Sequence, residues 1–270
     1  MKRLMFFAIL LSLGLWACQQ QSAPVVVEKT NKPAQFAFLT PPDIHLRLKV
    51  ENIGDVTVKG SMPDKTVFQI DREAKASNKH RAAELLDRIG VVPTMDKDGL
   101  IQFRPELPEL KGGETVLSHV TILVPLNQRV PISIAMTGGK FLAAGMEGDL
   151  ILKTSGSVDV ALRAYQGVFD CDLDRGVAQL GSLLQGGTIH MRSGKIQISQ
   201  RLKDPMNDIV VNMENGDVVV DVINGFSGRI RLEAPEVKNS TNIKLADSAE
   251  GKGIWVRVSQ GSAHLRSLLY

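Results

Sequence analysis

Short stretches of the chain alternate apolar and polar residues, which is the pattern of half-buried β-strands. Leu46, Leu48 and Val50 alternate with polar residues, and the alternation resumes at Val56 and Val58 after a turn at residues 52–54. Further short strands are expected at residues 67–70, 120–125, 150–152, 196–198, 218–220 and 230–232.

One segment has a helical period instead. Its apolar residues stand at positions i, i+3, i+4 and i+7 and form a single stripe: Ala82, Leu85, Leu86 and Ile89. Ser77 or Asn78 is expected to cap the start, and Gly90 to adopt the left-handed conformation at the end. Residues 96–99 then predict a hairpin turn.

From about residue 115 onward no helical pattern of similar strength appears, and glycine-centred turns recur, mostly every 8 to 12 residues. This spacing is typical of β-sandwiches, β-barrels and β-helices. The turn positions include Gly148, Gly156, Gly167, Gly176, Gly186, Gly194, Gly216, Gly228 and Gly251.

The composition is that of an ordinary globular protein, with 270 residues, of which 43% are hydrophobic and 23% charged. The formal net charge is +3, and Lys2 and Arg3 belong to a segment expected to be removed. A nearly neutral chain without basic clusters has no electrostatic footprint for nucleic acid, so no nucleic-acid partner is expected.

The first 17 residues have the pattern of a signal peptide. Lys2 and Arg3 precede an apolar stretch from Met5 to Leu15, which is too short to span a bilayer as a helix, since that needs about 20 residues. The sequence Leu15-Trp16-Ala17-Cys18 resembles the lipobox of bacterial lipoproteins. The alternative is a plain secretory signal with an incidental cysteine.

The lipobox resemblance implies cleavage after Ala17, a diacylglycerol on the Cys18 thiol and an acyl chain on the new amine. These chains would anchor the protein to a lipid bilayer. Gln19 stands where an Asp commonly retains lipoproteins at the inner membrane. Because residue 19 is Gln and not Asp, the outer membrane is favoured if the organism is Gram-negative.

Four parts of the chain are expected. They are a signal peptide at 1–17, a lipidated cysteine with a flexible tether at 18–42, a strand–helix–strand region at 43–113 and a β body at 114–270. Residues 43–270 are expected to form one continuous domain.

Three features resemble a family of bacterial envelope proteins, the putative adhesins. They are an opening at residues 53–60 followed by a strand and one helix, a strand ending in Val124-Pro125, and repeated Gly-Asp strands at residues 148–153 and 215–220. Together they span about residues 44–260. The resemblance implies a mainly β fold, a β-solenoid with an N-terminal strand region that carries one α-helix, and a location in the cell envelope.

No catalytic motif, metal-ligand spacing or cofactor signature is present in the sequence, so no cofactor is expected beyond the acyl groups on Cys18. The other cysteine, Cys171, alternates with acidic residues and is expected to be a small buried side chain. On a strand, Asp170, Asp172 and Asp174 project from one face, either as a solvated acidic stripe or as a cation or catalytic site. Trp255 is either an exposed contact or a cover for the last strands.

These observations favour a membrane-anchored, non-enzymatic binding, adhesion or scaffolding module with a protein or glycan partner in the envelope. Two alternatives remain open. One is a β-helical enzyme that acts on polysaccharide through Asp170, Asp172, Asp174 and Arg175, and the other is a regulatory partner in envelope sensing.

Overall fold

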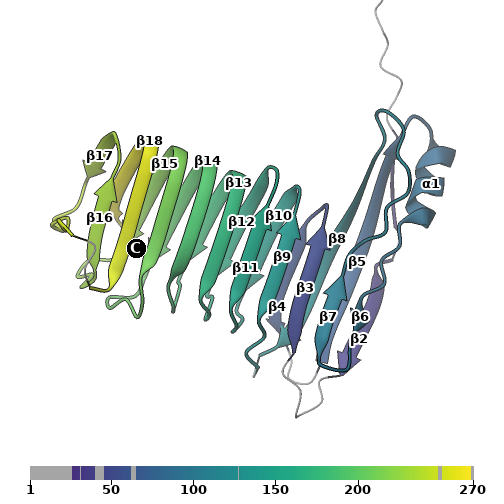
Figure 1. Ribbon diagram of the computed structural model, residues 1–270, viewed down its shortest axis with the longest axis horizontal. Helices are drawn as coiled ribbons and strands as arrows, with labels where there is room; N and C mark the ends of the chain where they lie inside the picture. The colour runs from purple at the N-terminus through teal and green to yellow at the C-terminus, as the bar shows by residue number, and fades with distance from the viewer. Residues whose placement is uncertain are drawn as a thin grey trace, which may run out of the picture.

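The computed structural model describes residues 26–30, 32–39, 46–61, 65–126, 128–248 and 251–268. Among them are eighteen strands and one helix, which confirms the mainly β prediction (Figure 1). The expected signal peptide, its cleavage site at Ala17 and the expected lipid attachment site at Cys18 lie outside the described residues.

All eighteen described strands belong to two ladders that run along the molecule. In the first ladder, neighbouring strands follow one another in this order: β6 (Thr94–Met95), β7 (Leu100–Phe103), β3 (Arg47–Asn52), β9 (Ile132–Met136), β11 (Leu150–Thr154), the first halves of β13 (Phe169–Gly181), β14 (Gly187–Gln200), β15 (Ile209–Val222) and β18 (Gly253–Ser267), and finally β16 (Arg229–Glu233).

The second ladder begins in an antiparallel region and continues with parallel strands. Its members in order are β1 (Val26–Lys29) and β2 (Ala34–Leu39), one after the other along the same edge of β5 (Lys65–Ala76), then β8 (Thr115–Pro125), β4 (Val56–Ser61), β10 (Gly139–Ala144), β12 (Val158–Arg163), the second halves of β13, β14, β15 and β18, and β17 (Glu236–Asn239).

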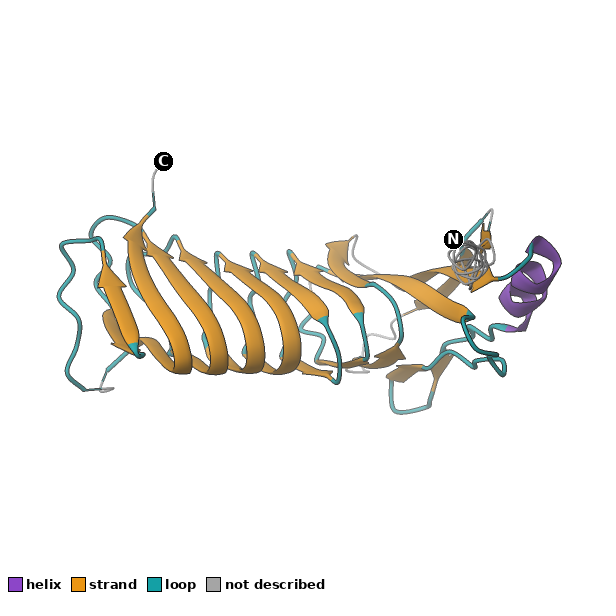
Figure 2. Ribbon diagram, turned by 90° about the horizontal axis from the view of Figure 1, so that it is seen from above, coloured by secondary structure: helices purple, strands orange, loops and turns teal. Residues whose placement is uncertain are grey.

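Four long strands pass from one ladder to the other at glycines that are register partners: Gly176, Gly194, Gly216 and Gly261. Their φ angles are 136°, 138°, 135° and 131°, a backbone conformation that residues with a Cβ rarely adopt. The two ladders therefore form one curled, open sheet, whose bent strands are visible in Figure 2. The pairings establish this sheet, and the expected solenoid stays a prediction.

The core fills the inside of the curl. In β14, Ile189, Met191 and Ile196 point inward and are buried, whereas His190 and Arg192 point outward. One hydrophobic cluster runs through the described residues from Leu46 to Leu265. At the C-terminal end of the first ladder, the order of strands in space departs from their order along the chain, because β18 lies between β15 and β16.

The predicted helix is α1 (Lys79–Arg88), which packs against β5 and β1 at one end of the molecule (Figure 1). Asn78 is the cap, since its side-chain oxygen accepts a hydrogen bond from the Arg81 N–H at 2.9 Å. The prediction for Gly90 was wrong. Ile89 is the C-terminal cap, in an extended conformation, and Gly90 pairs with Glu106 as an isolated β-bridge.

The tether predicted for residues 18–42 was too long. Residues Val26–Lys29 and Ala34–Leu39 form β1 and β2, both antiparallel to β5. The physical reason is the alternation of Ala34, Phe36 and Phe38, which pack against the core. The hairpin turn at residues 96–99 is confirmed, since it joins β6 to β7.

Candidate functional site

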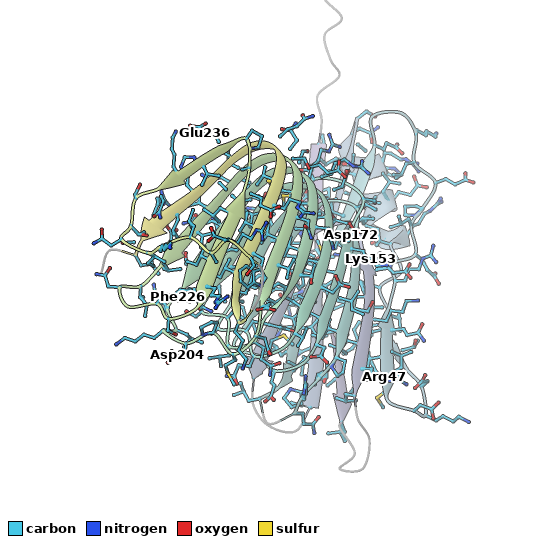
Figure 3. All side chains as sticks on the ribbon, turned by 60° about the vertical axis from the view of Figure 1, so that its left-hand side comes forward. Arg47, Lys153, Asp172, Asp204, Phe226 and Glu236 are labelled. Carbon is cyan, nitrogen blue, oxygen red and sulfur yellow. The ribbon has the colours of Figure 1, made fainter. Side chains whose placement is uncertain are left out.

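The outer face of the first ladder carries a row of polar side chains that runs across the strands. Strand register places Asp172 between Lys153 on β11 and His190 on β14. The row continues through Asn212 on β15 to Arg257 on β18. Figure 3 shows Lys153 and Asp172 near each other on this face.

A polar hollow of about 560 Å³ lies over this row. We use the name polar hollow for the space lined by Asp172, Asp174, His190, Arg192, Asn212, Glu214, Arg257 and Ser259, together with neighbouring atoms of β11, β13, β14 and β15. It lies beside Gly176, Gly194, Gly216 and Gly261, which we call the bend glycines because the four long strands bend there. Its position therefore follows from the same backbone feature that joins the two ladders.

An apolar hollow of about 820 Å³ lies next to it, between the segment that follows β7 and the strands β9 and β11. Its apolar lining comes from Ile53, Pro105, Leu107, Ala135 and Met136. Thr154 and Ser155 line both hollows, so the two form one continuous surface feature, which we call the groove.

Charges in the groove are largely compensated. Arg192 contacts Asp174 at 2.8 Å, and Arg175 contacts the same carboxylate at 3.6 Å. Arg257 contacts Glu233 at 2.9 Å, and the hydrogen bond from Arg257 lowers the pKa of Glu233 below its usual value. The groove thus offers many hydrogen-bond donors and acceptors without a large excess of either charge.

The three aspartates singled out in the sequence do not converge. Asp170 and Asp172 are exposed, and Asp170 does not line either hollow. Asp174 is engaged by Arg192, and its backbone N–H donates to Thr154 Oγ1 at 2.9 Å. Among the residues that the structure describes, no group of three or more His, Cys, Asp or Glu side chains is placed to hold a metal ion.

Trp255 lies outside the groove and is only 8% exposed. It points to the outer face of β18, in register with Val210 on β15 and Arg231 on β16. Of the two alternatives for this residue, the structure favours the cover over the exposed contact. Cys171 is buried as expected, and desolvation by burial raises the pKa of its thiol well above the usual range.

Sequence reasoning did not identify the groove, although a signal for it exists. Counting back two residues from the bend glycines gives Asp174, Arg192, Glu214 and Ser259, and counting back four gives Asp172, His190, Asn212 and Arg257. All eight line the polar hollow. Alignment of the chain on Gly176, Gly194, Gly216 and Gly261 therefore finds this part of the groove.

No protein-family model matches the sequence, and a search of curated proteins finds no match. Among solved structures, a putative adhesin from Bacteroides fragilis aligns with a TM-score of 0.38 and 14% identity, over 92% of this chain and 98% of that chain. A putative cell adhesion protein from Clostridium sporogenes aligns with a TM-score of 0.35 and 11% identity, over 88% of this chain and 100% of that one.

A putative lipid binding protein from Parabacteroides distasonis aligns with a TM-score of 0.35 and 9% identity, over 88% of this chain and 98% of that chain. The chain thus resembles putative adhesins of known structure, in keeping with the resemblance seen in the sequence. In the described part of the chain, the single helix, α1, has ten residues, and no helix there has the length and apolarity needed to cross a membrane.

Proposed function

We propose that this protein is a non-enzymatic binding module of the cell envelope, which holds an elongated partner in the groove. The observation that carries the proposal is the continuity of the two hollows through Thr154 and Ser155. The groove runs from β9 across β11, β13, β14 and β15 to β18. At about 4.8 Å between neighbouring strands, these five steps amount to about 24 Å.

A partner in this groove lies across the strands. It cannot pair with their backbones, because neighbouring strands already use those hydrogen bonds. Side chains must therefore recognise it, and their compensated charges suit a chain that both donates and accepts hydrogen bonds. A linear glycan and an extended polypeptide both have this chemistry. The engagement of Asp174 by Arg192 supports binding over acid catalysis by the aspartates.

The test compares two tryptophan variants on arrays of linear bacterial glycans and of extended peptides. Ser155→Trp places a large side chain where the two hollows meet, and we expect at least a tenfold loss of affinity. Lys195→Trp is the matched control, because Lys195 is also exposed but lies on β14 in the second ladder. Equal binding by both variants, or no binding by the wild type to either array, would contradict the proposal.

We also propose that Cys18 is lipidated and anchors the protein to a membrane, with the outer membrane favoured in a Gram-negative organism. The support is the sequence Leu15-Trp16-Ala17-Cys18 behind a short apolar segment. Intact mass and membrane fractionation of the wild type and of Cys18→Ser test this. We expect a mature chain that starts at Cys18 and carries acyl groups, and the loss of both features in the variant. A soluble, unacylated wild type would remove the anchor.

Finally, we propose that the two ladders are faces of a β-solenoid. The spacing of the bend glycines supports this, since Gly176, Gly194 and Gly216 occur at intervals close to 20 residues. In a solenoid each repeat contacts only its neighbours. Deletion of residues 169–186 is therefore expected to leave a shorter chain with the same circular dichroism spectrum per residue. Loss of all structure would contradict the proposal.

A further inference from the structure

Five strands have a free edge at the ends of the two ladders within the described residues, and four of them are protected against pairing with another chain. The strand β1 carries the charged residues Glu28 and Lys29, which pair with Lys79 and Glu73. The strand β6 has only two residues. The Ile230 carbonyl of β16 accepts a hydrogen bond from the Ala246 N–H at 2.7 Å. The strand β17 is exposed throughout and carries the charged pair Glu236 and Lys238. Short length, coverage and charge are the usual protections of free edges.

The strand β2 has none of these protections. Its six residues, Ala34–Leu39, carry no charged side chain, and among the described residues β2 pairs with β5 alone. Phe36 and Phe38 face the core but remain only half-buried, and Leu39 is 73% exposed. The Phe38 ring lies edge-on to Phe68 at 6.0 Å, so β2 is anchored in the core on its inner side.

We propose that β2 is a self-association site, where it pairs antiparallel with β2 of a second copy about a two-fold axis at Ala37. This register places Phe36 opposite Phe38 of the second copy on the core side. On the other side it places Gln35 opposite Leu39 of the second copy. Aromatic pairs directly opposite each other stabilise antiparallel strands, and no like charges meet.

The second copy is the occupant that the sequence of β2 favours. A two-fold axis requires a segment that complements itself, and the pairing of Phe36 with Phe38 occurs twice in this register, once on each side of the axis. The pairing also covers the open flanks of both phenylalanines, which β5 leaves exposed to solvent. It uses an edge at the α1 end of the molecule, so the groove is not required for it.

A cysteine placed on the axis tests the register. In an antiparallel pair, opposite Cα atoms lie about 4.5–5.5 Å apart, within the range of about 4.4–6.8 Å that a disulfide bridges. We therefore expect Ala37→Cys to form a disulfide-linked dimer when the full chain is oxidised at the membrane. The matched control is Gln35→Cys, because two copies of residue 35 are offset by four residues, or about 13 Å, and are expected to stay unlinked.

The native Cys171 is buried, so it is not expected to form intermolecular disulfides. Oxidation of the wild type measures any crosslinking through Cys18. Crosslinking of both variants to the same extent, or of neither, would overturn the proposal.

A second measurement does not depend on cysteine chemistry. We expect the wild-type mass, measured by light scattering on the detergent-solubilised full chain, to rise toward that of a dimer with increasing concentration. Ala37→Lys sets two positive charges against each other on the axis and should remain monomeric. Val237→Lys is the control, because Val237 is a similarly exposed residue on the edge strand β17. A wild type that is monomeric at every concentration would refute the proposal, whatever the groove binds.

Discussion

At the scale of single residues, glycine decides how the strands bend. Gly176, Gly194, Gly216 and Gly261 stack so closely that a Cβ at any of the last three would lie about 2 Å from the carbonyl oxygen of the glycine before it in the stack. The sequence marks Gly176, Gly194 and Gly216 as turn positions. The structure shows bends inside continuous strands instead, because each glycine lies within one long strand and stays in register with a glycine of the neighbouring strand.

Gly194→Ala tests this requirement. The new Cβ would lie 2.0 Å from the Gly176 oxygen, at a φ of +138°. We expect the free energy of unfolding to fall by at least about 2 kcal/mol, since strained backbone alone costs about 1–3 kcal/mol. Urea denaturation measures the change. Gly112→Ala is the control, because a Cβ there meets no atom within 4 Å. Equal stability of the two variants would contradict the role of the bend.

The pH dependence of stability can be assigned in part to Glu114. Arg81 hydrogen-bonds its carboxylate, and the Lys111 N–H adds another hydrogen bond; together they lower the pKa of Glu114 from 4.5 to about 2. A lowered pKa in the folded state stabilises the protein above the unfolded value. That stabilisation is lost as the pH falls from about 4.5 through about 2.

We therefore expect the stability advantage of the wild type over Glu114→Gln to be constant near pH 6 and to shrink steadily below pH 4.5. Urea unfolding at a series of pH values measures it. Glu109→Gln is the control, an exposed residue of the same segment whose side chain makes no ion pair among the described residues. An advantage that does not change between pH 6 and pH 3 would show that this ion pair is not formed.

At the scale of elements, predictions succeeded where the signal is local. The helix α1 follows from a single apolar stripe, and the β6–β7 hairpin from its turn residues. Two failures concern strands that need a distant pairing partner in addition to their local pattern. The strand β5 runs from Lys65 to Ala76, well beyond its apolar alternation, because it pairs with β8 along most of its length. The strands β1 and β2 exist because β5 offers them an edge.

The helix start offers a test, since the sequence alone left Ser77 and Asn78 as alternatives. Only Asn78 accepts the Arg81 N–H in the structure. Asn78→Ala is therefore expected to lower the free energy of unfolding by about 0.5–2 kcal/mol. Ser77→Ala should change it by much less, and thermal denaturation of both variants makes the comparison. A larger effect of Ser77→Ala than of Asn78→Ala would contradict the assignment of the cap to Asn78.

At the scale of the molecule, the groove depends on register, and register is not local. The sequence pointed to Asp172 and Asp174, which do line the polar hollow. It did not place His190, Arg192 or Glu214 beside them, because those residues lie 16 to 42 positions further along the chain. Parallel pairing at the bend glycines brings them together. The apolar hollow depends on a still longer connection, since Leu107 lies opposite residues of β9 and β11.

The same long-range pairing predicts that residues 46–268 unfold as one unit. The N-terminal region shares both ladders and one hydrophobic cluster with the rest. Ile122 in β8 is fully buried near the α1 end, and Trp255 in β18 reports on the far end as the only tryptophan after residue 18. Ile122→Ala is expected to cost about 2–5 kcal/mol.

In a single cooperative unit, the fluorescence transition of Trp255 shifts by the same amount as the circular dichroism transition of the whole chain. If the N-terminal region were a separate domain, Ile122→Ala would leave the Trp255 transition at the wild-type midpoint. A matched substitution in the far half, Ile196→Ala, removes an equally buried side chain and should shift both signals in either case. Only the variant at Ile122 therefore distinguishes one continuous domain from two.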